Sequence, residues 1–220
     1  MHGVWDGVPR RTNIKSTGRT SVKKFVYTTI FLYLVLTKAV YADLAFDRMC
    51  VFGDSLSDAG IVFEITHTVA NRPYDLIPNA PYPIGGMTFS NGKTWIQQLA
   101  KSLKMQKGAK PAFRNRGTFC NYAFGGARAG GVSPFDLTEQ VITYQGDFGM
   151  TSSDGTLFVV LIGGNDIRDA IEAFPADPTP IFTDAINAVS FSVIELYRSG
   201  ARQFLIHNAP NLALVPAIIL

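Results

Sequence analysis

Residues 51–60 read Val51-Phe52-Gly53-Asp54-Ser55-Leu56-Ser57-Asp58-Ala59-Gly60, and an apolar run that starts at Leu44 leads directly into this stretch. The pattern predicts a strand that ends at a tight turn, where a parallel α/β sheet places its reactive groups. A serine at such a turn can act as a nucleophile, because its hydroxyl projects into the crevice above the strand ends. Ser and Asp are also common helix caps, so a purely structural role for Asp54 and Ser55 stays open at this point.

The composition is that of a globular protein with a sizeable core. Among the 220 residues, 47% are hydrophobic and 12% are aromatic. The formal net charge of +3 is unevenly distributed, since residues 1–42 hold seven of the 20 basic residues and one of the 17 acidic ones. Residues 43–220 therefore keep 13 basic and 16 acidic residues. A mildly acidic body argues against a nucleic-acid partner.

The N-terminus has the pattern of an export signal. Lys23 and Lys24 precede an apolar run over 25–36, and Ala39-Val40-Tyr41-Ala42 follows. This predicts a leader and signal peptide over 1–42, cleaved after Ala42, and an exported domain over 43–220. The run is shorter than the roughly 20 residues that span a bilayer, and a retained membrane anchor is the alternative. The leader is long for a signal peptide, which suggests the hypothesis that translation starts at Val22.

Strands alternate with helices along the rest of the chain. The long segment 61–92 is rich in Pro and Gly and is expected to be an irregular functional loop. Apolar periodicity predicts helices over 93–103, within 131–150, and from Thr179 to a stop at Gly200. Further strands are expected at 119–124, 156–162 and 203–206. The alternation predicts a parallel sheet covered by helices on both faces.

Two cysteines, Cys50 and Cys120, each lie just inside a predicted buried strand. An exported protein can pair them in a disulfide, and two buried free thiols are the equally supported alternative. No Cys/His cluster has metal-ligand spacing, and no cofactor is expected.

Three of the predicted strand ends carry polar or glycine-rich tips. They are Gly-Asp-Ser-Leu-Ser at 53–57, Asn-Tyr-Ala-Phe-Gly-Gly-Ala at 121–127 and Gly-Gly-Asn-Asp at 163–166. Because parallel strands end at one edge of a sheet, Ser55, Gly126 and Asn165 are expected to surround one spot. The hydroxyl can attack an acyl carbon, while two backbone N–H groups and one side-chain amide stabilise the oxyanion, at about 3 kcal/mol each. Asp166 is expected to orient its own turn through local hydrogen bonds rather than to act as an acid.

These segments resemble the GDSL, or SGNH, family of serine esterases and lipases. The stretch Phe89-Ser90-Asn91-Gly92-Lys93-Thr94-Trp95, followed by Leu99-Ala100, is also similar to the bacterial and plant lipase branch of that family. The resemblance implies a flavodoxin-like three-layer αβα sandwich with a central parallel sheet. It also implies Ser55 as nucleophile, with Gly126, rather than Gly125, and Asn165 as oxyanion donors.

The general base that such a serine needs is missing from the sequence. The family carries it as an Asp-x-x-His pair near its C-terminus, and no Asp-x-x-His occurs here. His2 belongs to the leader, His67 to the long loop, and His207 is the one candidate for a substitute base, although a structural role for it is favoured. We therefore expect the sequence to be the N-terminal two-thirds of such a hydrolase and to be weakly active or inactive.

The sequence thus predicts a secreted or periplasmic hydrolase of carboxylic esters, either lipid or other acyl esters. Its partners would be a small-molecule or lipid ester and, transiently, a membrane surface; the oligomeric state stays open. One alternative is a non-catalytic binding module that has lost the base, and another is a carbohydrate O-deacetylase on the same scaffold.

Overall fold

The computed structural model describes residues 3, 25–29, 46–66, 87–90, 92–152, 155–209 and 211. The chain divides into two compact units, Met1–Leu44 and Ala45–Leu220. Residues 25–29 of the first unit are helical. Within the described residues, no helix is both long enough and apolar enough to cross a bilayer. The predicted signal peptide lies almost wholly outside these residues and stays a prediction.

The second unit is built on three parallel strands in the order β1-β2-β3. The strands are β1 (Arg48–Gly53), β2 (Thr156–Leu161) and β3 (Gln203–Ile206). Val51 of β1 lies opposite Val159 of β2, which in turn lies opposite Leu205 of β3. The parallel α/β sheet predicted from the sequence is confirmed. Strands covered on both faces have near-continuous apolar sequences, as β1 and β2 do.

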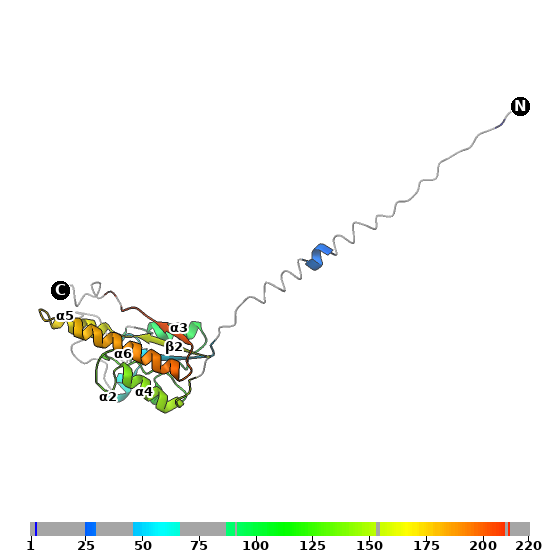
Figure 1. Cartoon of the computed structure of the whole chain (residues 1–220). Helices are drawn as coiled ribbons and strands as arrows, with labels where there is room; N and C mark the ends of the chain where they lie inside the picture. The colour runs from blue at the N-terminus through cyan, green and yellow to red at the C-terminus, as the bar shows by residue number, and fades with distance from the viewer. Residues whose placement is uncertain are drawn as a thin grey trace. The chain divides into compact units, whose positions relative to one another are not determined.

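Helices cover both faces of the sheet (Figure 1). Successive strand residues point to opposite faces, so Phe52 and Phe158 pack in one core with α4 (Leu137–Phe148) and α6 (Thr179–Arg198). Val51 and Val159 pack in the other core, against α3 (Trp95–Ser102). All three helices lie where the apolar periodicity predicts them. The result is a three-layer α/β arrangement.

Residues 119–124 run beside β1, but the expected regular strand is wrong. Val51 donates its N–H to Cys120 (2.8 Å), and Tyr122 and Phe124 donate theirs to Val51 (2.8 Å) and Gly53 (3.0 Å). Only Asn121 forms a bridge of the sheet type. The backbone turns just before this point, where the Phe119 N–H binds the Asn115 carbonyl (2.9 Å), so regular pairing cannot extend backward. The segment still follows β1 to its carboxyl end.

Three short helical elements were not expected. They are α2 (Ile61–Thr66), the 3-10 turn η2 (Ala112–Arg114) and α5 (Gly164–Glu172). The expectation of an irregular segment from residue 61 is wrong for α2, whose first residue Ile61 is fully buried and donates its N–H to Asp58 Oδ1 (2.6 Å). Residues 67–86 of the expected loop, with His67, lie outside the described residues.

A disulfide joins Cys50 of β1 to Cys120 of the neighbouring segment. The alternative of two free thiols is therefore wrong. The bond joins β1 to the segment that leads into the tip at residues 121–127. It lies near the start of the stretch over which this segment and β1 run side by side.

Candidate active site

The chain turns sharply as soon as β1 ends at Gly53. The Asp54 carbonyl accepts the N–H groups of Ser57 and Asp58 (3.0 Å each), and Asp54 Oδ1 accepts the Leu56 N–H (3.0 Å). These bonds bury Asp54 and Ser57 and leave Ser55 partly exposed at the outer side of the turn. Neither the hydroxyl nor the N–H of Ser55 has a hydrogen-bond partner among the described residues. Both groups are therefore available to a ligand at the carboxyl edge of the sheet.

The tip at residues 121–127 is bonded to this turn at two points. Asn121 Nδ2 donates to the Ser57 carbonyl (2.9 Å), and the Gly125 N–H donates to Asp58 Oδ2 (3.0 Å). Gly126 follows with a φ of +89°, a left-handed conformation that favours glycine. Its N–H has no acceptor among the residues described, and a Cβ there would meet nothing within 4 Å. The Gly125 N–H is thus occupied and the Gly126 N–H is open.

The third tip follows β2 and begins α5. Gly163, with a φ of +106°, precedes the helix, and Asn165 in its first turn is buried. Asn165 Nδ2 donates to the Ala127 carbonyl (2.7 Å), which binds this tip to the second one. An amide nitrogen carries two hydrogens, so one donor remains. The structure therefore places Ser55, Gly126 and Asn165 on three neighbouring tips, each of which is hydrogen-bonded to the next.

Asp58 is the connection between the first and second tips. Its buried carboxylate accepts N–H groups from Gly60 (2.7 Å), Ile61 (2.6 Å), Val62 (3.3 Å) and Gly125 (3.0 Å). Burial raises the pKa of Asp58 above its ordinary value, and the four N–H donors oppose that change. One side chain thus begins α2 and fixes the glycine turn beside Ser55.

Comparison with known proteins assigns the family. The model of the family described as GDSL-like Lipase/Acylhydrolase matches residues 49–219. The chain belongs to this family.

Three relatives illustrate the range of proteins that the chain is similar to. Lipase 1 of Photorhabdus luminescens is 27% identical over 199 residues, which cover 90% of this chain and 27% of that protein. An acetylesterase of Thermothelomyces thermophilus is 28% identical, with 90% of this chain and 66% of the relative covered. A phosphatidylcholine-sterol acyltransferase of Aeromonas hydrophila is 25% identical, with 89% and 54% covered. The chain thus spans less than two thirds of the length of each of these relatives.

Asp54, like Asp58, is a buried carboxyl group of this GDSL-like domain whose pKa is raised. Burial, together with the nearby Asp166 carboxylate, raises the pKa of Asp54 from 3.8 to about 6, against the opposing effect of the Leu56 N–H. The Gly164 backbone also lies against it, since a Cβ on Gly164 would stand 3.5 Å from Asp54 Oδ2. Asp54 therefore carries a buried charge at neutral pH, directly before Ser55.

Asp166 has a structural role, though not quite the expected one. Its two carboxylate oxygens accept the N–H groups of Ala129 and Gly130 (2.9 Å each). Arg128 forms a two-point ion pair with Asp169 one turn further along α5. Asp166 therefore fixes the segment after Gly126 rather than its own turn, and side chains of α5 hold that segment on both sides.

Gln140 is a positioning residue that sequence reasoning missed. From α4, its buried amide accepts the Gly53 N–H (2.8 Å) and donates to the carbonyls of Gly53 and Phe135 (2.8 Å each). It fixes the last residue of β1, two positions before Ser55. The available signal was a polar residue on the apolar face of α4, beside Leu137, Val141 and Tyr144, all of which are buried.

His207 follows β3 at the carboxyl edge but makes no hydrogen bond to Ser55. It is exposed, its N–H binds the Val160 carbonyl (2.9 Å), and its ring packs edge-on against Trp95 with centroids 4.9 Å apart. Trp95 in turn donates its indole N–H to Ser57 Oγ (3.1 Å). His2 and His67 lie outside the described residues. In the part of the chain that is described, no group of His, Cys, Asp or Glu is placed to hold a metal ion.

Proposed function

We propose that this chain hydrolyses carboxylic esters, with Ser55 as the nucleophile. The observation that carries the proposal is the partly exposed Ser55 at the carboxyl edge, whose own N–H and that of Gly126 have no acceptor among the described residues. Membership of the GDSL-like lipase/acylhydrolase family supports it.

The proposed reaction follows from these groups. Ser55 Oγ attacks the acyl carbon and loses its proton to a base, while the carbonyl oxygen gains negative charge. The N–H groups of Ser55 and Gly126 and the free amide hydrogen of Asn165 donate to that oxygen, each contributing about 3 kcal/mol. The alcohol leaves with a proton, and water then attacks the seryl ester and releases the carboxylic acid.

Among the described residues, none is placed to act as the base. The printed sequence contains no Asp-x-x-His, and His207 contacts Trp95 rather than Ser55. Loss of the base from a serine hydrolase costs several orders of magnitude in rate. We therefore expect slow turnover by the 220-residue chain and a rise in rate when imidazole is added as an external base.

The test compares the full chain with Ser55→Ala and with Ser102→Ala, an exposed serine of α3. Hydrolysis of 4-nitrophenyl acetate and butyrate is measured over a range of imidazole concentrations, and the acylated protein is examined by mass spectrometry. We expect an imidazole-dependent rate and an acyl adduct on Ser55 in the wild type and in Ser102→Ala. Equal rates for wild type and Ser55→Ala at every imidazole concentration, without an adduct, would favour a non-catalytic binding module.

The substrate is proposed to be a lipid or another acyl ester. Relatives named lipase and acyltransferase favour lipid esters, and the relative named acetylesterase favours short acyl groups, including the acetyl groups of a carbohydrate. Rates on esters of increasing acyl length and on an acetylated glycan separate these two candidates.

Export from the cytoplasm is proposed on two grounds. Lys23 and Lys24 precede the apolar run at 25–36. The Cys50–Cys120 disulfide is also typical of proteins in oxidising compartments. N-terminal sequencing of the secreted protein tests both the export and the cleavage after Ala42.

A further inference from the structure

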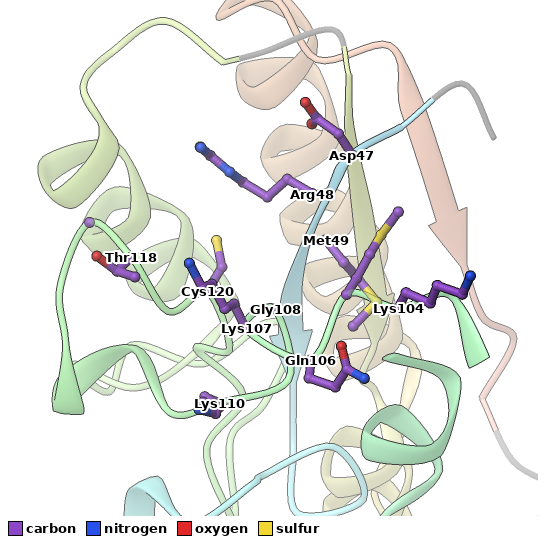
Figure 2. Close-up of a pocket in the computed structure, with 12 residues that line it drawn as sticks. Asp47, Arg48, Met49, Lys104, Gln106, Lys107, Gly108, Lys110, Thr118 and Cys120 are labelled. Carbon is purple, nitrogen blue, oxygen red and sulfur yellow. The ribbon is translucent and has the colours of Figure 1, made fainter. Parts of the chain in front are cut away.

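A cavity lies at the amino edge of the sheet, at the other end of β1 from Ser55. Its volume is about 580 Å³, within the range of small-molecule pockets. The start of β1 forms one wall, the loop at 104–110 another, and residues 117, 118 and 120 a third. In Figure 2, Asp47 lies at one end of the pocket, and Arg48 extends from β1 toward the loop that carries Thr118.

The lining of this pocket is strongly basic. It includes Arg48, Lys104, Lys107 and Lys110 against the single carboxylate of Asp47. None of these four cations forms an ion pair with a described carboxylate. Elsewhere in the same unit, arginines are paired, as in Arg114–Glu64, Arg116–Asp147 and Arg128–Asp169. Unpaired positive charge thus collects in one concave site of a domain that is mildly acidic.

A structural role accounts for only some of these cations. The last turn of α3 carries Lys101, and Lys104 follows the helix end closely, where cations interact favourably with the helix dipole. That effect falls off within one turn. Arg48 and Lys110 also lie over the rings of Phe148 and Phe119, at 5.1 Å and 4.8 Å from the ring centroids. These ring contacts leave both side chains charged, and Lys107 has no such contact among the described residues. In Figure 2, Lys104 also extends to the side away from Arg48.

The walls that carry the remaining cations are fixed in place. Gly108 is buried against β1, where a Cβ would stand 2.3 Å from the Met49 carbonyl oxygen. Its N–H binds the Met105 carbonyl (2.9 Å), and the Lys110 N–H binds the Lys107 carbonyl (3.3 Å). The opposite wall is attached to β1 by the Cys50–Cys120 disulfide. The pocket is therefore formed before any ligand enters.

We propose that this pocket binds the phosphoryl group of a phosphate ester. Arg48 supplies a planar guanidinium suited to two-point binding of phosphate oxygens, Lys107 and Lys110 supply point charges, and Thr118 supplies a hydroxyl donor. The cavity is much larger than a phosphate ion, so it also has room for the alcohol part of the ester. A soluble phosphate ester and the headgroup of an anionic lipid share this chemistry.

The test measures binding to the full chain at low ionic strength by calorimetry and by vesicle co-sedimentation. The probes are inorganic phosphate, glycerol 3-phosphate, and phosphatidylcholine vesicles with and without phosphatidic acid. The variant is Lys107→Gln/Lys110→Gln, and the control is Lys101→Gln, whose side chain is exposed on α3 outside the pocket. Removing each cation next to a bound anion is expected to weaken binding about 5-fold. The double variant should thus lose at least about 10-fold in affinity and Lys101→Gln less than about 2-fold.

Each outcome decides the proposal. Binding of glycerol 3-phosphate that the double variant weakens supports a soluble ester as the ligand. Binding only to vesicles that contain phosphatidic acid, again weakened by the double variant, supports a lipid headgroup. No binding of any probe, or an equal loss in Lys101→Gln, overturns the proposal, because the second result would indicate diffuse attraction to surface charge. Unchanged thermal unfolding of the variants shows that they are folded, and Ser55→Ala should bind as the wild type does.

Discussion

The Asp54→Asn variant should change how stability depends on pH. Asp54 is 3% exposed and lies in the turn directly before Ser55. Burial raises its pKa from 3.8 to about 6. Asparagine has nearly the same shape, keeps an oxygen that can accept the Leu56 N–H, and carries no charge at any pH. The variant therefore removes the buried charge, and it also replaces Oδ2, which faces the Gly164 backbone, by an NH2 group.

The sign and the size of the effect follow from linkage between proton binding and folding. Below pH 3.8 the carboxyl is protonated in both folded and unfolded chains, so the folded protein has no charge to bury. As the pH rises from 3.8 through about 6, the free energy of unfolding falls, because the folded protein must then bury a charged carboxylate. The interval from 3.8 to about 6 corresponds to about 3 kcal/mol, at about 1.4 kcal/mol per pKa unit.

Urea unfolding at several values between pH 4 and pH 7.5 measures this effect. The free energy of unfolding of the wild type should fall by about 2.4 kcal/mol relative to Asp54→Asn over that range, because the first part of the change already lies below pH 4. Asp177→Asn serves as the control. Asp177 is exposed, and hydrogen bonds from Thr179 lower its pKa. Removing this carboxylate therefore cannot raise the free energy of unfolding at neutral pH as Asp54→Asn does. Parallel curves for the wild type and Asp54→Asn would refute the reasoning.

Three further perturbations address the frame around Ser55. Gln140→Leu leaves the Gly53 N–H buried without its acceptor and should lower the free energy of unfolding by about 2–4 kcal/mol, as measured in urea; a loss below about 1 kcal/mol would contradict the positioning role. Gly53→Ala places a Cβ 2.3 Å from the Leu161 carbonyl oxygen, so β1 must move away from β2; we expect a loss of at least about 3 kcal/mol, and a native melting temperature would contradict this. Reducing the Cys50–Cys120 disulfide, which spans 70 residues, should cost about 4 kcal/mol, measured by unfolding with and without a reductant and with Cys50→Ala/Cys120→Ala as the comparison.

The sheet could be predicted from the sequence because its strands are buried on both faces. Such strands have continuous apolar sequences between turn residues, and β2 and β3 lie at the predicted positions, 156–162 and 203–206, to within a residue. The segment at 119–124 has a similar apolar character but lacks a second partner strand among the described residues. Its tertiary contacts with residues 110–115 replace the expected regular pairing.

The contacts that hold the candidate site could not be predicted in the same way. Asp58, Gln140 and Asp166 act on backbone N–H groups that are 36 to 87 residues away in the chain, and no local pattern indicates such partners. α5 was missed because Gly163 and Gly164 suggest a turn, whereas the following residues gain stability by bonding to the neighbouring tip. The start of α2 was predictable in principle, since Asp58 stands three residues before Ile61, a common capping distance.

The candidate active site and the proposed phosphoryl pocket lie at opposite ends of β1, and this has a kinetic consequence. Six residues of a parallel strand span about 20 Å, so an ester at Ser55 and a phosphoryl ligand beside Arg48 do not compete for space. Inhibition of ester hydrolysis by such a ligand would therefore not arise from direct competition with the ester for the same space. Any influence of one ligand on the affinity of the other would have to be mutual and of equal size in both directions.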